Sequence, residues 1–196
     1  MPPLSDVNTT NVSFSSPRSA LFGTEPCRST LIAAQRTGLW LDALGFIPAY
    51  TTFLCLAAWA TRHRLRGGII AALLVAGLCD EIEGAQLFAI VRDLPGTPGQ
   101  LDALWWPVHV KFALLAIGTA AIGSAILARS LSAMLLGLLV TGFGLGAIVA
   151  LVVGAQTLMM QWFMDGWAAL LLAAGVGAVW PRLLAPRPRA PVVPSA

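Results

Sequence analysis

Apolar residues run along the chain in five long segments, separated by short groups of polar or charged residues. The segments lie at approximately 39–61, 67–92, 103–128, 131–154 and 160–181. A helix needs about 20 residues to cross the roughly 30 Å of hydrocarbon in a bilayer, and each segment is close to that length. The pattern therefore predicts an all-α fold, a polytopic membrane helical bundle with about five transmembrane helices.

The division between the last two segments is the least distinct, because residues 131–181 are almost continuously apolar. Only the stretch GAQTLMMQWFMDGW, at 154–167, resembles a turn region. The length of 131–181 nevertheless requires two full spans. The alternative is a bundle of four spans with both chain ends in the cytoplasm.

The two ends of the chain differ in composition from the apolar middle. Residues 1–28 are rich in Ser, Thr, Asn and Pro, and we expect a disordered N-terminal tail. Residues 29–38 can form a short interfacial helix that begins at a Ser cap and ends at Gly38. The transmembrane helical domain then covers 39–182, and the Pro- and Arg-rich residues 183–196 are expected to form a disordered C-terminal tail.

Two prolines and two glycines predict local features of the spans. Pro48 is expected to kink the first span, and Pro107 to lie in the first turn of the third, where its missing N–H costs little. Gly142 and Gly146 form a GxxxG pattern, which marks close contact between helices.

The composition supports a membrane protein and excludes several other classes. Hydrophobic residues make up 57% of the 196 residues and charged residues 11%, so the mean hydropathy of +0.79 lies outside the range of soluble domains. The arginines occur in short groups beside apolar segments, which argues against nucleic-acid binding. Cys27, Cys55 and Cys79 form no CxxC pair, and only two histidines are present, so we expect no metal and no cofactor.

The arginines also predict the orientation of the chain. They gather in the first loop, the third loop and the C-terminal tail, and the positive-inside rule places such groups in the cytoplasm. The residues are Arg62, Arg64, Arg66, Arg129, Arg182, Arg187 and Arg189. We therefore expect a cytoplasmic C-terminus and, with five spans, an N-terminus on the outer side.

Three carboxylates stand in the middle of the second span, within the sequence GLCDEIEGAQLF. Helical residues advance by about 100°, so Asp80 and Glu83 lie roughly 60° apart, while Glu81 points about 100° away from Asp80. Gly77 and Gly84 share the stripe of Asp80 and Glu83, and glycines allow another helix to approach closely. We expect this stripe to face protein and not lipid.

Lys111, the only lysine, lies in the third span and is the expected partner of these acids. Glu83 is nine residues from Arg92, and Lys111 is nine residues from Asp102, at the two ends of the connecting loop. Both side chains should therefore lie roughly 13 Å below the outer interface. An ammonium group at that depth costs roughly 2.5–3.5 kcal/mol unless it is paired. We expect Lys111 to pair with Glu83 first and with Asp80 second.

Three further ionisable residues are possible accessory polar groups in the outer half of the bundle. His109 lies about 160° round the helix from Lys111, so the two cannot easily share one face. Asp42 and Asp165 stand near the starts of the first and fifth spans.

The buried charge cluster of Asp80, Glu81, Glu83 and Lys111 allows more than one function. Charge pairs can fix the register of two helices without any chemistry, which favours a non-catalytic membrane module. Ionisable residues within membranes also mark proton relays and ion pathways, and the excess of acids favours a proton- or cation-coupled small carrier as the alternative. An intramembrane lipid-modifying enzyme is the third class. An enzyme is disfavoured because no serine or cysteine nucleophile has a base at a recognisable spacing.

The sequences AGLCDEIEGAQL and VHVKFALLAI resemble a pattern in uncharacterised small bacterial polytopic membrane proteins. There a span carrying Asp-x-x-Glu-Asn is followed by a span carrying Lys-Phe. The resemblance covers roughly residues 70–118 and rests on Asp80, Glu83, Lys111 and Phe112, whereas Gly84 replaces the Asn. It implies a multi-pass protein of the bacterial inner membrane and brings no known activity. The expected partners are the lipid bilayer and, further, a second copy or another membrane protein.

Overall fold

The computed structural model describes residues 25–94, 96–127 and 131–179. Most of the predicted N-terminal tail and the whole of the predicted C-terminal tail lie outside the described residues. Residues 25–28, which we expected in the tail, belong to the first helix.

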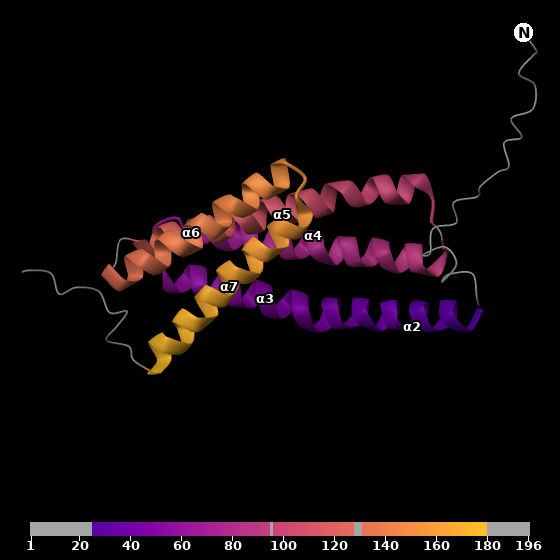
Figure 1. The fold of residues 1–196 in the computed structure, drawn as a ribbon, viewed down its shortest axis with the longest axis horizontal. Helices are drawn as coiled ribbons and strands as arrows, with labels where there is room; N and C mark the ends of the chain where they lie inside the picture. Colours follow the sequence, from indigo (N-terminus) through magenta and orange to yellow (C-terminus); the bar gives the residue numbers. More distant parts are fainter. Residues whose placement is uncertain (1–24, 95, 128–130, 180–196) are drawn as a thin grey trace, which may run out of the picture. The chain divides into compact units, whose positions relative to one another are not determined.

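All regular elements in the described part of the chain are helices, and Figure 1 shows their order. They are α2 (Glu25–Leu41), the π-helical segment η1 (Asp42–Phe46), α3 (Ile47–Ala60), α4 (Arg66–Arg92), α5 (Pro98–Leu127), α6 (Leu131–Val152) and α7 (Gln156–Val179). The segments α2, η1 and α3 follow one another without a gap and form one continuous helix. Together with α4, α5, α6 and α7, the described residues therefore contain five helices. The predicted all-α helical bundle is confirmed.

Four helical segments are long and apolar enough to cross a membrane: Ser29–Ala60, Pro98–Leu127, Ala133–Val152 and Gln156–Val179. They mark the chain as a membrane protein. The remaining helix, α4, is 27 residues long and is not among them. Its length suffices for a span, but Asp80, Glu81 and Glu83 stand in its middle.

The chain divides into two compact units, residues 1–38 and 39–196. In the described part of the first unit, Thr37 donates a hydrogen bond from its side chain to the carbonyl oxygen of Ala33, at 3.0 Å. The expected helix end at Gly38 is not observed, because α2 continues to Leu41. A glycine within a helix costs about 1 kcal/mol relative to alanine but breaks no hydrogen bond.

Pro48 explains the π-helical segment that precedes it. Proline has no N–H, so the carbonyl group of Leu44 loses its normal partner four residues later. The backbone widens in the turn before it, and the N–H of Ile47 donates to the carbonyl oxygen of Asp42, five residues back. Where we expected a kink at Pro48, the structure has this wide turn.

The helix α5 begins earlier than the apolar pattern indicated. The side-chain oxygen of Gln100 accepts a hydrogen bond from the N–H of Thr97 at 2.8 Å, and the hydroxyl of Thr97 accepts one from the N–H of Gln100 at 3.3 Å. This reciprocal cap, with Pro98 directly after it, starts the helix. Pro107 therefore lies inside α5, and the prediction that it occupies the first turn is wrong.

The helices α6 and α7 are separated by a tight turn at the beginning of the predicted turn region. Gly154 there has a φ of 73°, a left-handed conformation that favours glycine. The helix α7 starts at Gln156, so most of the stretch 154–167 is helical and not a turn.

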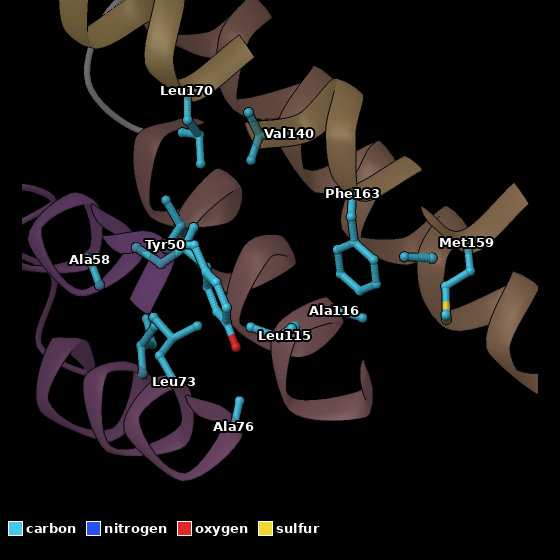
Figure 2. Close-up of a cluster of buried hydrophobic side chains, with 14 of the residues drawn as sticks. Tyr50, Ala58, Leu73, Ala76, Leu115, Ala116, Val140, Met159, Phe163 and Leu170 are labelled. Atoms are coloured by element: carbon cyan, nitrogen blue, oxygen red, sulfur yellow. The ribbon is translucent and has the colours of Figure 1, made fainter. Parts of the chain in front are cut away.

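The core of the second unit is formed by helices that pack on their neighbours in the sequence. Leu54 of α3, Leu73 of α4, Ile122 of α5 and Val140 of α6 are completely buried. In Figure 2 the ring of Tyr50 lies between Leu73 and Leu115, and Phe163 of α7 points towards α5 near Ala116. Many large apolar side chains are exposed, as expected of helices that face lipid.

Candidate functional site

Lys111 of α5 contacts both acids of the predicted stripe on α4. Its Nζ lies 2.7 Å from Oδ1 of Asp80 and 2.5 Å from Oε2 of Glu83. The side chain of Lys111 is 8% exposed, and those of Asp80 and Glu83 are 18% and 19% exposed. We call Asp80, Glu83 and Lys111 the ion-paired triad.

The positions of the triad follow from helix geometry. Asp80 and Glu83 are three residues apart, so their side chains lie on one face of α4, and one ammonium group can reach both. Glu83 lies nine residues before Arg92, and Lys111 lies nine residues after Asp102. Because α4 and α5 are antiparallel, these equal separations place the two side chains at the same level. The structure thus brings together the residues that the sequence suggested as partners.

Tyr50 of α3 adds a residue that the sequence analysis did not identify. Its hydroxyl donates a hydrogen bond to Oδ2 of Asp80 at 2.7 Å, so both carboxylate oxygens of Asp80 have partners. Tyr50 is the only tyrosine in the chain and stands in an apolar span two residues after Pro48. A single hydroxyl in an apolar span could have indicated a polar contact, because a buried tyrosine usually needs a hydrogen-bond partner.

Aromatic side chains connect α7 with α3 and α5. The ring of Trp167 stacks on Tyr50 with the centroids 5.4 Å apart and an interplanar angle of 17°. The indole N–H of Trp167 donates to the hydroxyl oxygen of the buried Thr119 at 3.2 Å. Phe163 and Phe112 stack with their centroids 6.0 Å apart. These contacts place aromatic rings beside the triad.

A cavity of about 230 Å³ lies against the triad. Its walls come from Leu39 at the end of α2 and from η1, α3, α4, α5 and α7, and most of the lining residues are apolar or aromatic. The polar or charged groups on its wall are Asp42, Tyr50, Asp80, Glu83, Lys111 and Trp167. Gly84 also lines the cavity, and a Cβ atom added there would meet nothing within 4 Å.

Glu83 and Asp42 keep hydrogen-bonding capacity at the cavity. Oε1 of Glu83 accepts no hydrogen bond from the described residues, whereas Oε2 accepts one from the ammonium group of Lys111. The exposed carboxylate of Asp42 also has no donor or ion-pair partner in the described part of the chain. The cavity therefore presents acceptor oxygens whose partners the described residues do not supply.

The other predicted residues lie outside the triad. Glu81 has no hydrogen bond or ion pair within the described ranges, as its different direction on α4 implied. The ring of His109 stacks on that of Trp105 with the centroids 4.1 Å apart. Nδ1 of His109 lies 2.7 Å from the carbonyl oxygen of Trp105. Asp165 is exposed and does not line the cavity.

The two glycines of the α4 stripe have different surroundings. A Cβ atom on Gly77 would lie 2.7 Å from the hydroxyl oxygen of Thr51, so α3 packs closely there. Gly84 faces the open cavity instead. The expectation of a close helix contact along this stripe therefore holds at Gly77 and is wrong at Gly84, where the π-helical segment and α7 leave a space.

In the part of the chain that the structure describes, no group of three or more His, Cys, Asp or Glu side chains is placed to hold a metal ion. Cys55 and Cys79 are free thiols. Comparisons with protein families, with curated proteins and with solved structures found no match to this chain. The interpretation of the site therefore depends on its own chemistry.

Proposed function

We propose that this protein is a non-catalytic membrane module that binds a small amphipathic molecule, with the ion-paired triad as its polar core. The observation that carries the proposal is the cavity of about 230 Å³ against the triad. Ligand sites are usually concave and mostly apolar, with a few polar groups that orient the ligand. This cavity has that composition.

Two details distinguish the site from a charge pair that only joins two helices. A purely structural pair is expected to be enclosed, with its polar atoms satisfied by the surrounding protein. Here Glu83 keeps an unpaired oxygen beside the cavity. A π-helical segment, a feature frequent at functional sites, supplies Asp42 and Phe46 to the same cavity.

Binding of 2-phenylethanol, a neutral molecule with one polar end, tests the proposal. The protein in lipid nanodiscs should bind it above the level of empty nanodiscs, as measured by ligand-observed NMR. Gly84→Leu should abolish this excess, because its side chain would enter the cavity. The matched control is Gly142→Leu at an exposed helical glycine with nothing nearby, which should retain it. Equal binding by both variants, or none by the unaltered protein, would reject a binding module.

A proton- or cation-coupled carrier is the second candidate, favoured by the contact of Asp80 and Glu83 with the cavity. A carrier needs these acids to exchange protons or ions with water. Purified protein in liposomes should then show pH-dependent flux that disappears in folded Asp80→Asn or Glu83→Gln variants. We expect no such flux, because the sequence shows no inverted repeat and five helices enclose little room for a pathway.

We also propose that α4 is a fifth span and that the chain lies in the bacterial inner membrane with a cytoplasmic C-terminus. Support comes from Arg62, Arg64 and Arg66, which stand together in the sequence between α3 and α4 and at the start of α4. A reporter active only in the cytoplasm should be active at the C-terminus and silent at the N-terminus. Activity at both ends would favour four spans, and a silent C-terminal fusion would reject the orientation.

A further inference from the structure

We infer that the cavity beside the ion-paired triad takes a hydrophobic monocation, an apolar or aromatic body that carries one ammonium group. The inference rests on the proposed binding function and names the chemical class of the ligand. It depends on the charge around the cavity, on the acceptors left unpaired there, and on the aromatic rings of its wall.

The charged side chains that line the cavity favour a cation. Asp42, Asp80 and Glu83 are acids, and Lys111 is the one base among the lining residues. Acidic side chains on the cavity wall therefore outnumber basic ones by two. A bound monocation reduces this excess, whereas an anion increases it, and the effect is large where little water screens the charges.

Lys111 is not available to bind an anion. Its ammonium group donates to Asp80 and to Glu83, and it also lies 4.6 Å from the centroid of the Phe112 ring. With its side chain only 8% exposed, it is surrounded by these partners. An anionic ligand would have to displace a carboxylate from Lys111 and leave that carboxylate unpaired, which is strongly unfavourable.

The unpaired acceptors match the donors of an ammonium group. A primary ammonium has three N–H donors and no acceptor. Oε1 of Glu83 and the carboxylate of Asp42 accept hydrogen bonds, and neither receives one from the described residues. The hydroxyl of Tyr50 is already directed at Asp80, so it does not compete for Glu83.

Aromatic rings complete the wall. Phe46 and Tyr50 lie with their centroids 5.3 Å apart, and Trp167 stacks on Tyr50. Such faces attract cations and also cover apolar groups. The cavity volume of about 230 Å³ exceeds the roughly 150 Å³ of an engineered cavity that binds benzene, so a ring with a short aminoalkyl group fits.

The test compares 2-phenylethylammonium with the neutral 2-phenylethanol and the anionic phenylacetate. Each is titrated into the protein in uncharged lipid nanodiscs, with empty nanodiscs as the blank. We expect the cation to bind at least about tenfold more tightly than the alcohol, because hydrogen bonds to charged groups contribute about 1.5–3 kcal/mol. We expect no measurable binding of the anion.

The variants assign this preference to the cavity. Asp42→Asn leaves the triad intact and should reduce the preference for the cation over the alcohol several-fold, and Glu83→Gln should do the same in protein that remains folded. Gly84→Leu should abolish binding of both ligands, and Gly142→Leu should retain both. Equal binding of cation and alcohol, both lost in Gly84→Leu, would overturn the inference and leave the binding module standing. Absence of binding by all three probes would reject both.

Discussion

The helix α5 makes two kinds of contact, a charged one with α4 and an uncharged one with α6. On the α4 side, Lys111 pairs with two acids beside a cavity. On the α6 side, backbones approach so closely that a Cβ atom on Gly123 would lie 2.5 Å from the backbone nitrogen of Thr141. The helix α6 carries no charged residue. This bundle therefore achieves close helix packing without ion pairs.

The difference bears on the role of the triad. Small residues bring helices together in lipid through close packing, and this suffices between α5 and α6. Ion pairs within a membrane carry a large desolvation cost and are weak evidence for stability. The charged contact coincides with open space at Gly84, and this coincidence supports the proposed binding role of the triad.

The largest effect is expected from Lys111→Met, which breaks the charged contact. It leaves Asp80 and Glu83 without their cation and should lower the free energy of unfolding by roughly 1–4 kcal/mol. Unfolding in mixed detergent micelles, followed by tryptophan fluorescence, measures the change.

The control for this variant restores the charge balance. Adding Glu83→Gln to Lys111→Met removes one of the uncompensated acids and should recover part of the lost stability. If the double variant is no more stable than Lys111→Met alone, the loss does not come from the broken pair.

The uncharged contact is tested by Gly123→Ala. The added methyl group would meet backbone atoms of α6, which cannot move as a flexible side chain can. Overpacking of this kind typically costs about 1–3 kcal/mol. The same micelle unfolding experiment should show the loss, and an unchanged stability would mean that α5 and α6 are less tightly packed than the structure indicates.

Tyr50→Phe tests the link between α3 and the triad with a smaller change. It removes the hydroxyl that donates to Asp80 but keeps the ring that stacks on Trp167. Asp80 still pairs with Lys111, so the expected loss is about 0.5–1.5 kcal/mol. A loss as large as that of Lys111→Met would mean that Tyr50 is as important to the triad as its cation.

The sequence predicted the features that depend on local periodicity and failed on those that depend on several helices. The positions of α4 and α5 and the pairing of Lys111 follow from counting residues along neighbouring helices. The sequence did not predict the contact between Tyr50 and Trp167, because the two residues are far apart in sequence and meet only where α7 packs beside α3 and α5. The sequence did not predict the cavity either, because its wall is formed by residues from several helices.

The glycines show the same limit at a finer scale. The GxxxG pattern of Gly142 and Gly146 suggested one close contact, but the two glycines have different surroundings. A Cβ atom on Gly146 would lie 2.7 Å from the ring of Trp162, whereas one on Gly142 would meet nothing. The closest backbone approach to α5 uses other glycines, Gly137 and Gly144. Spacing identifies glycines on one face but not the face that meets a neighbour.

Gly142→Ala therefore gives the smallest expected effect and the control for Gly123→Ala. Both substitutions add one methyl group to a helix, but only the one at Gly123 meets backbone atoms. Stability should not fall and should rise by about 0.5–1 kcal/mol, because alanine is the better helix former and nothing obstructs the added methyl group. Self-association in micelles, measured by chemical cross-linking, should be unchanged. A clear loss of cross-linked dimer without loss of monomer stability would instead place Gly142 in an interface between two copies, because close contact at a glycine is what the added methyl group disrupts.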